Sequence, residues 1–120
     1  MSFKQNCQRL YDHYVTCYQN GDAKGCASIF AAHAEMYSPF GPPAIGRQAI
    51  EDVHAEWVAE KGAQNKQVNV LSANREGDLG WCVGEFSEGM TGEGVSLNIL
   101  ARQSDGRWLI THCSLNEAFQ

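Results

Sequence analysis

The chain has 120 residues, with 43% hydrophobic residues, 19% charged residues and a formal net charge of −5 at pH 7. This is the composition of an ordinary globular protein, and we expect one domain over residues 1–120. The Lys and Arg residues are scattered and form no basic stripe, which argues against nucleic acid and anionic membrane surfaces as partners. No apolar stretch is long enough to span a membrane, and the polar start lacks the apolar core of a signal peptide, so we expect a cytoplasmic protein.

The cysteines are odd in number and form no C-x-x-C pair; they are Cys7, Cys17, Cys26, Cys82 and Cys113. In a chain without a signal peptide, this pattern favours reduced thiols packed as small core residues over a disulfide framework. No Cys or His pair has the spacing of metal ligands, so we expect no metal site. No cofactor is expected either.

The first half of the chain has helical periodicity. Asn20-Gly21 ends a first helix, and Asp22 is placed to cap a second one, in which Cys26, Ile29 and Phe30 face inward. The first helix carries an apolar stripe at steps of three and four residues, formed by Phe3, Cys7, Leu10, Tyr14 and Tyr18.

A strand, an irregular loop and a third helix follow. Residues 33–38 have strand character, and the prolines of residues 39–43 predict a departure from regular structure. The third helix is expected to begin near Gly46-Arg47 and to end at Lys61-Gly62. Its buried face would consist of Ile50, Val53, His54 and Trp57.

The second half of the chain alternates as strands separated by short turns. The expected strands cover residues 66–75, 79–88, 94–103 and 107–116. Four consecutive strands joined by short turns form an antiparallel meander. Helices followed by such a meander give an α+β fold.

The order of these motifs resembles a known superfamily. Asn20-Gly21-Asp22, the Pro-rich loop of residues 38–43, Gly46-Arg47 and residues 105–110 occur in the sequence typical of nuclear transport factor 2-like proteins. Over residues 7–117 the chain is most similar to the SnoaL-like polyketide cyclases and the steroid Δ-isomerases. The resemblance implies a conical α+β barrel, in which three N-terminal helices pack in a strongly curved, mainly antiparallel sheet around one pocket. It also implies a small apolar ligand and a homodimer formed through the outer face of the sheet.

The steroid isomerases use a tyrosine and a protonated aspartate to stabilise an oxyanion, and a carboxylate as the base. The resemblance matches the tyrosine with Tyr14, the protonated aspartate with Asn98 and the base with Ser38. The amide of Asn98 always carries N–H donors, whereas an unassisted serine hydroxyl does not accept a proton at neutral pH. We therefore expect the pocket to keep its oxyanion donors and to lack the carboxylate base, so steroid isomerisation by this mechanism is not expected.

Two histidines are alternative bases. His54 shares the predicted helix face of Ile50 and Trp57, and His112 alternates with Ile110 along the last strand, which places these two on one face. Both patterns are equally typical of a packed or hydrogen-bonded histidine. Tyr14, His54, Asn98 and His112 are thus the candidate catalytic residues.

Further residues are candidates for contact with a ligand, although most such residues simply pack in a core. They are Tyr18, Ser38, Phe40, Trp57, Phe86, Met90 and Leu100. One function consistent with this set is a cofactor-independent isomerase, cyclase or dehydratase acting on an apolar carbonyl compound. The alternative is a non-catalytic ligand-binding or dimerisation module of the same fold.

Overall fold

The structure is a computed structural model that describes residues 1–88 and 92–117, so the candidate ligand contact Met90 lies outside the described residues. Its helices are α1 (Phe3–Gln19), α2 (Ala23–Ala27), α3 (Arg47–Val58) and a short 3-10 helix, η1 (Ala63–Asn65). Its strands are β1 (Phe30–Ser38), β2 (Gly41–Ile45), β3 (Gln67–Glu76), β4 (Leu79–Ser87), β5 (Gly94–Arg102) and β6 (Trp108–Glu117).

The strands form one sheet in the order β2-β1-β6-β5-β4-β3. Strands β3 to β6 are the predicted antiparallel meander, and their ends agree with the expected ranges to within one residue. β1 lies parallel to β6 and antiparallel to β2. The α+β class and the mainly antiparallel sheet are therefore confirmed.

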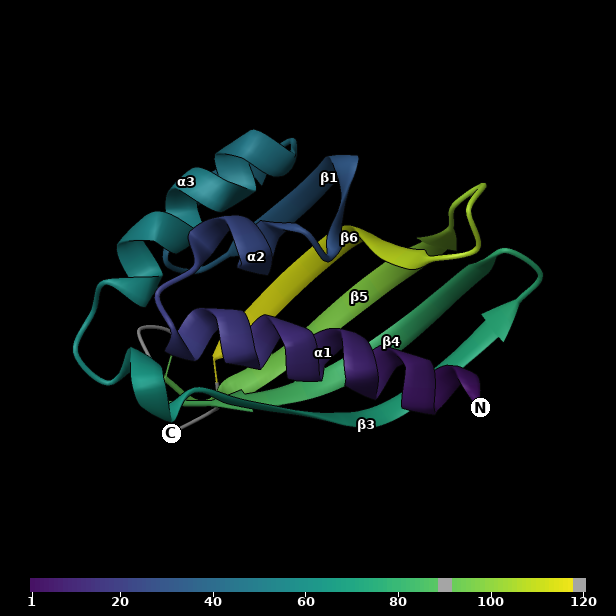
Figure 1. Cartoon of the computed structure of the whole chain (residues 1–120), viewed down its shortest axis with the longest axis horizontal. Helices are drawn as coiled ribbons and strands as arrows, with labels where there is room; N and C mark the ends of the chain where they lie inside the picture. The colour runs from purple at the N-terminus through teal and green to yellow at the C-terminus, as the bar shows by residue number, and fades with distance from the viewer. Residues whose placement is uncertain (89–91, 118–120) are drawn as a thin grey trace.

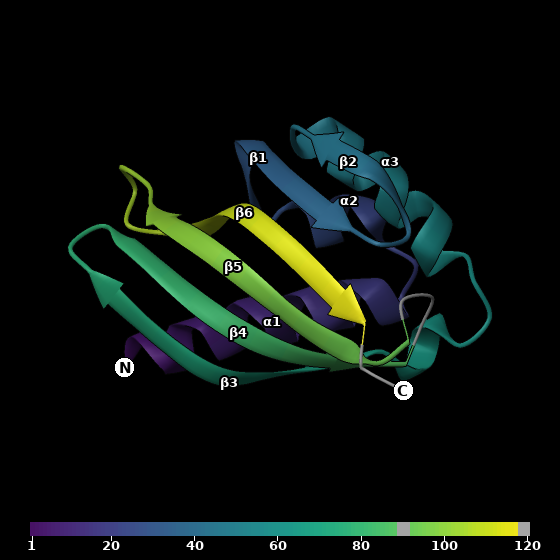
Figure 2. The same ribbon diagram turned by 180° about the vertical axis from the view of Figure 1, so that it is seen from behind.

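The curved sheet has one covered and one open face. In Figure 1, α1 lies across β3 to β6 on the concave face, and α2 and α3 stack on the side of β1. Figure 2 shows the opposite face from behind, where no helix lies over β3 to β6. Within the described residues, no helix combines the length and the apolar character that a membrane span requires.

The expectation of an irregular loop over residues 39–43 is wrong in part, because β2 contains Pro42 and Pro43. β2 is at the edge of the sheet and pairs only with β1, so a missing N–H breaks no hydrogen bond on its outer side. The strand before it also begins earlier than expected. Phe30 belongs to β1, where it lies opposite Ile110, and not to the second helix.

The helices are anchored largely as the sequence indicates. Ser2 and Gln5 form a capping box at the start of α1, and Asp22 accepts a hydrogen bond from the backbone N–H of Gly25 at the start of α2. The buried face of α1 differs from the predicted apolar stripe, since Tyr11 is buried and Leu10 is only half-buried. α3 ends at Val58, earlier than predicted, because the chain turns there into η1.

The core fills the space between α1, α3 and the concave face of the sheet. All five cysteines are buried free thiols, as predicted. The buried set on α3 consists of Ile50, His54 and Trp57, which confirms the predicted face except for Val53, which is half-buried.

Candidate functional site

A cavity lies inside the cone, between α1, α3 and the concave face of the sheet. Its walls are Tyr11, Tyr14, Phe30, Met36, His54, Trp57, Lys66, Val68, Phe86, Ser96, Cys113 and Leu115. Between these walls and at the mouth there is about 400 Å³ of space, counted with the part open to solvent. The centre of a water molecule can reach only about 30 Å³ of it, so the aromatic walls leave room for one or two water molecules.

Tyr14 and His54 form a hydrogen-bonded pair in this wall. The Tyr14 hydroxyl lies 2.8 Å from Nε2 of His54, and Nδ1 of His54 lies 2.8 Å from the carbonyl oxygen of Ile50. A carbonyl only accepts, so Nδ1 carries the imidazole proton and Nε2 is the acceptor. The Tyr14 hydroxyl therefore donates to His54 and presents its lone pairs to other groups.

Burial keeps both members of this pair neutral. The pKa of His54 is lowered from 6.5 to about 4, mainly by burial; the hydrogen bond to Ile50 opposes this shift, and the nearby Lys66 charge contributes to it. Burial also raises the pKa of Tyr14 well above its usual value. At neutral pH the pair consists of a phenol and a neutral imidazole, which acts as a weak base.

Lys66 is a wall residue that the sequence analysis did not single out. Its side chain is buried, and its Nζ lies 5.0 Å from the ring centroid of Tyr18 and 4.8 Å from that of Phe86. Burial lowers its pKa from 10.5 to about 8. The available signal was the alternation of Lys66, just before β3, with Val68 and Val70 within it, since alternate residues of an extended chain share a face.

Asn98 is buried in β5 but is not a wall residue of the cavity. Its Nδ2 donates to Oγ of Ser96 at 3.1 Å and approaches the Cys82 carbonyl oxygen at 3.5 Å. Its Oδ1 is buried and accepts no hydrogen bond from the described residues. The structure therefore places Tyr14 on the cavity wall and Asn98 behind it, with Ser96 between Asn98 and the cavity.

The candidate ligand contacts divide into two groups. Trp57 and Phe86 line the cavity. The other candidates within the described residues do not: Tyr18 and Leu100 are fully buried in the surrounding core, Phe40 packs edge-on against Trp57, and Ser38 accepts a hydrogen bond from the N–H of Phe40 at 3.3 Å. The Ser38 hydroxyl is thus engaged in a local hydrogen bond at the end of β1 and does not line the cavity.

His112 lies on the outer face of the sheet, so the expectation that it shares the face of Ile110 is wrong. Consecutive residues of β5, Ile99 and Leu100, pair with His112 and Ile110, which leaves Thr111 as an extra residue. This β-bulge resets the alternation, so Ile110 is buried and His112 is exposed. Nε2 of His112 lies 3.8 Å from Oε2 of Glu35 on β1.

Within residues 1–88 and 92–117, no group of three or more His, Cys, Asp or Glu side chains is arranged to hold a metal ion. The polar groups in the cavity wall are therefore the Tyr14–His54 pair, the Lys66 amine, the Tyr11 and Ser96 hydroxyls and the Cys113 thiol, whose pKa burial raises to about 12. This arrangement can orient a polar end of an apolar molecule and can offer a proton acceptor and a cation.

Comparison with known proteins identifies the family. The model of the SnoaL-like domain matches residues 8–116, whereas no relative with a curated description matches the sequence. A cystatin-like domain of unknown function from Nostoc punctiforme shares the fold with a TM-score of 0.79 at 13% identity, over 100% of this chain and 81% of that chain. A ketosteroid isomerase-like protein from Erwinia carotovora atroseptica gives a TM-score of 0.74 at 14% identity, over 93% of each chain.

ActVI-ORFA from Streptomyces coelicolor gives a TM-score of 0.64 at 17% identity, over 93% of this chain and 94% of that chain. At such identities these structures establish the shared fold. The family match spans most of the chain and agrees with the curved sheet and its helices, so the chain belongs to the SnoaL-like domain family.

Proposed function

We propose that the chain binds a small, mainly apolar molecule inside the cone, with the polar end of the ligand directed at Tyr14, His54 and Lys66. The observation that carries this proposal is the position of these three groups in the wall of an otherwise largely apolar cavity. Protein sites for small molecules commonly combine apolar walls with a few polar groups and enclose roughly 300–1,000 Å³. The cavity as it stands lies far below this range, because the centre of a water molecule can reach only about 30 Å³ of it. Binding therefore requires side chains such as Met36 and Leu115 to move.

Binding can be tested with ¹⁵N-labelled protein and a panel of cyclic and aromatic ketones. A ligand is expected to shift the amide resonances around Tyr14, His54 and Lys66. Leu115→Trp, which adds bulk to the wall, should weaken binding, whereas Ile45→Trp, at an exposed position on the edge strand β2, should not. Ketones that bind the two variants equally well, or that shift only surface resonances, would exclude the cone as the site.

Proton transfer next to a carbonyl group is the second candidate function, and it rests on the hydrogen bond of 2.8 Å between Tyr14 and His54. A substrate proton can pass to the Tyr14 oxygen while the Tyr14 proton passes to Nε2 of His54. The charged amine of Lys66 would then stabilise the enolate oxygen. This assignment differs from the expected clamp, because Tyr14 accepts a proton here and Lys66 replaces Asn98 as the oxyanion partner.

The second candidate can be tested without knowledge of the natural substrate. Ketones that bind are incubated with the protein in D₂O, and deuterium uptake beside the carbonyl is followed by mass spectrometry. His54→Phe and Lys66→Met should each reduce uptake by at least about tenfold, in the range of general acid–base contributions. Lys61→Met, at an exposed position, is the matched control. If the unmodified protein binds a ketone but catalyses no deuterium uptake, proton transfer is excluded and non-catalytic binding remains as the function.

We also propose that two copies of the chain associate through the open face of the sheet. Several large apolar side chains on this face are 40–60% exposed, namely Leu71, Leu79, Trp81, Val95, Leu97 and Ile99. Trp81 lies opposite Ile99 in the sheet, so the patch extends across neighbouring strands. A monomeric protein rarely exposes so many adjacent apolar side chains. Light scattering should give a dimer mass, Leu97→Arg should give a monomer, and a monomer for the unmodified chain at micromolar concentration would refute the interface.

A further inference from the structure

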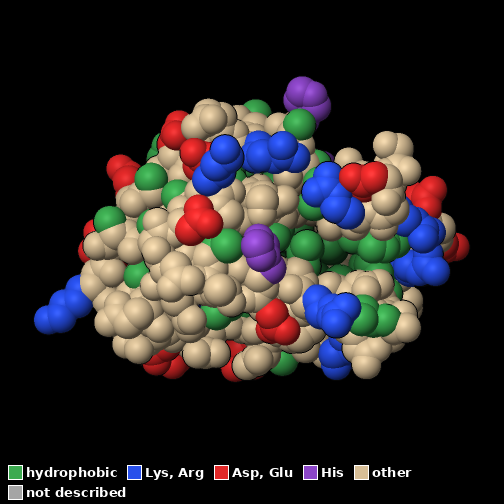
Figure 3. Space-filling view, in the orientation of Figure 1, with side chains coloured by type: hydrophobic (Ala, Val, Ile, Leu, Met, Phe, Trp, Pro, Cys, Tyr) green, Lys and Arg blue, Asp and Glu red, His purple; other side chains and the backbone are tan. Residues whose placement is uncertain are grey.

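A second hollow lies outside the cone, between the N-terminal half of α1 and the turn that joins β5 to β6. We name it the arginine groove, because Arg9, Arg102 and Arg107 are in its walls, together with Leu10, Trp108 and Leu109. It is open to solvent, the centre of a water molecule can reach about 550 Å³ of it, and it shares no described wall residue with the cavity inside the cone. Figure 3 shows hydrophobic side chains at the bottom of a hollow, with Lys or Arg side chains around it. The groove is thus large enough for a small molecule.

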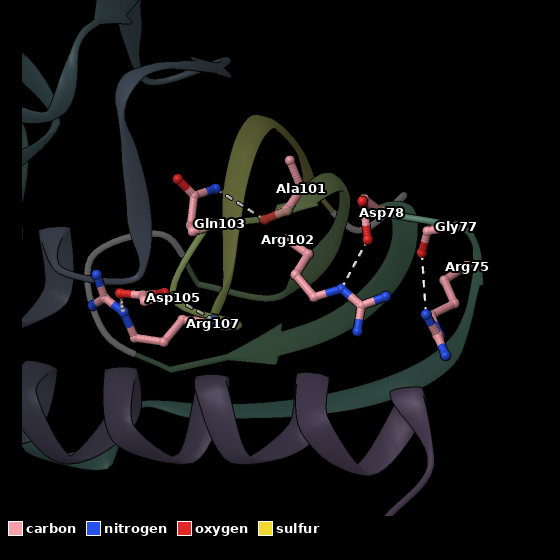
Figure 4. Close-up of polar contacts among 8 residues, drawn as sticks. All are labelled: Arg75, Gly77, Asp78, Ala101, Arg102, Gln103, Asp105 and Arg107. Atoms are coloured by element: carbon pink, nitrogen blue, oxygen red, sulfur yellow. Dashed lines mark hydrogen bonds and ion pairs between the residues drawn. The ribbon is translucent and has the colours of Figure 1, made fainter.

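Arg102 and Arg107 are each positioned by the carboxylate of an aspartate. Nε of Arg102 lies 2.9 Å from a carboxylate oxygen of Asp78, and Nε of Arg107 lies 2.8 Å from one of Asp105 (Figure 4). The hydrogen bonds found among the described residues use only Nε of each of these guanidinium groups, so their terminal amino groups can meet a ligand. These contacts restrict Arg102 and Arg107 without occupying the donors that best recognise a carboxylate. Arg9 has a different partner, since its Nη1 lies 3.8 Å from Sδ of Met1.

The local charge is positive although the chain as a whole is negative. Three arginines and the two aspartates that pair with Arg102 and Arg107 leave a balance of +1, in a chain with a net charge of −5. No aspartate or glutamate is among the described wall residues of the groove. The groove therefore complements one negative charge.

The floor of the groove offers a flat apolar surface. Trp108 is half-buried and packs edge-on against Phe3 with 4.8 Å between ring centroids. The guanidinium of Arg102 lies 5.2 Å from the Trp108 ring centroid, and that of Arg75 lies 5.9 Å from it. A guanidinium beside an indole presents a stacking surface and a charge-assisted donor at the same place. Leu10 and Leu109 complete an apolar floor beside the charged rim.

We propose that the arginine groove is a binding site for a small organic carboxylate with a flat apolar body. The carboxylate would lie between Arg9 and Arg107, and the apolar body would lie on Leu10 and Trp108. The single net positive charge favours a monoanion over a phosphate ester with two negative charges. This site is independent of the function proposed for the cone.

The test compares two probes that differ in charge and share a ring, 2-naphthoate and 2-naphthylmethanol. Each is titrated into the ¹⁵N-labelled full chain at low ionic strength. Naphthoate is expected to shift the resonances of residues 6–13 and 102–109 and to bind at least about tenfold more tightly than the neutral probe, because the carboxylate forms charge-assisted hydrogen bonds. Raising the salt concentration should weaken only naphthoate binding. Equal affinities, or shifts confined to the cone, would overturn the proposal.

Variants separate the groove from the general charge of the protein. Arg107→Gln should weaken naphthoate binding several-fold, and Arg9→Gln combined with Arg107→Gln should weaken it by at least about tenfold. Lys61→Gln removes the same charge at an exposed position outside the groove and should leave the affinity within about twofold, as expected for a screened distant charge. Arg107→Lys keeps the charge but loses the planar fork, so its affinity should lie between those of Arg107→Gln and the unmodified chain. Unchanged affinity in the double variant, with an unchanged melting temperature, would show that the arginines do not form the site.

Discussion

The interior of the cone and the arginine groove use opposite means to meet a polar ligand. In the interior, the Tyr14–His54 pair is buried and neutral, and the buried Lys66 has a lowered pKa. In the groove, the three arginines are exposed, and Arg102 and Arg107 are paired with aspartates. Desolvation disfavours charge in the interior and hardly affects the groove. Burial thus favours uncharged polar groups in the interior, whereas the groove arginines stay in contact with solvent.

The largest difference between the two regions should appear in the free energy of unfolding, when a large side chain in the wall of each is replaced by alanine. Phe30 is buried in the interior, so Phe30→Ala should lower the free energy of unfolding by about 3–5 kcal/mol. Leu10 is half-buried in the groove, so Leu10→Ala should cost about half as much or less, since less apolar surface is returned to water. Urea unfolding, monitored by circular dichroism, measures the free energy of unfolding of both variants. Similar costs would contradict the contrast between a packed interior and an open groove.

The second-largest effect is the dependence of the free energy of unfolding on pH, to which the buried His54 should contribute. The pKa of His54 in the folded chain is about 4, below its value of 6.5 when unfolded, so the unfolded chain binds more protons between these values. Stability from the neutral imidazole is therefore complete above pH 6.5 and is lost as the pH falls toward 4. Between pH 7 and pH 5 this residue should account for a loss of about 2 kcal/mol.

Urea unfolding at both pH values checks this expectation. In a Tyr14→Phe/His54→Phe double variant, the difference between pH 7 and pH 5 should shrink by about that amount. His13→Gln, which replaces an exposed histidine in the groove, should retain the full difference. A double variant with unchanged pH dependence would show that His54 is not held neutral by burial.

A smaller effect is expected from the tyrosine hydroxyl. Tyr14→Phe removes the donor to Nε2 of His54 and leaves this buried acceptor without its partner, which should cost about 1–3 kcal/mol. Tyr37→Phe removes a hydroxyl that bonds Glu35 on the outer face, and should change stability by less than about 0.5 kcal/mol. Thermal or urea unfolding of both variants at pH 7 makes the comparison. Equal effects would indicate that the buried pair contributes nothing beyond a surface contact.

The smallest effect on stability should come from the groove itself. Arg9→Gln is expected to change the free energy of unfolding by less than about 0.5 kcal/mol, as for most surface substitutions. Its effect should appear in anion binding instead. A clear loss of stability in Arg9→Gln would show that the groove arginines are structural, which would narrow the contrast between the two regions.

Much of the fold could be predicted because local patterns and the tertiary structure agree. The meander strands, the start of α3 at Arg47 and the buried face of Ile50, His54 and Trp57 follow directly from period and turn residues. The family resemblance added the curved sheet. It also directed attention to Tyr14, which is in the wall of the cavity.

Other features depended on pairing between distant segments. The position of His112 depends on the bulge at Thr111, which arises from the pairing of β5 with β6 and interrupts a regular alternation. The edge position of β2 explains why a strand can contain Pro42 and Pro43. Neither property is encoded in the spacing of the residues concerned.

The sequence by itself determined the order and kind of most elements, because periodicity and turn chemistry are local properties. Only the tertiary structure decided how polar groups meet. It joined Tyr14 on α1 to His54 on α3, placed Lys66 over two aromatic rings, and brought Arg9 near Arg102 and Arg107. These groups are far apart in the chain, and their protonation and recognition properties depend on burial and distance, which exist only after the segments have packed together.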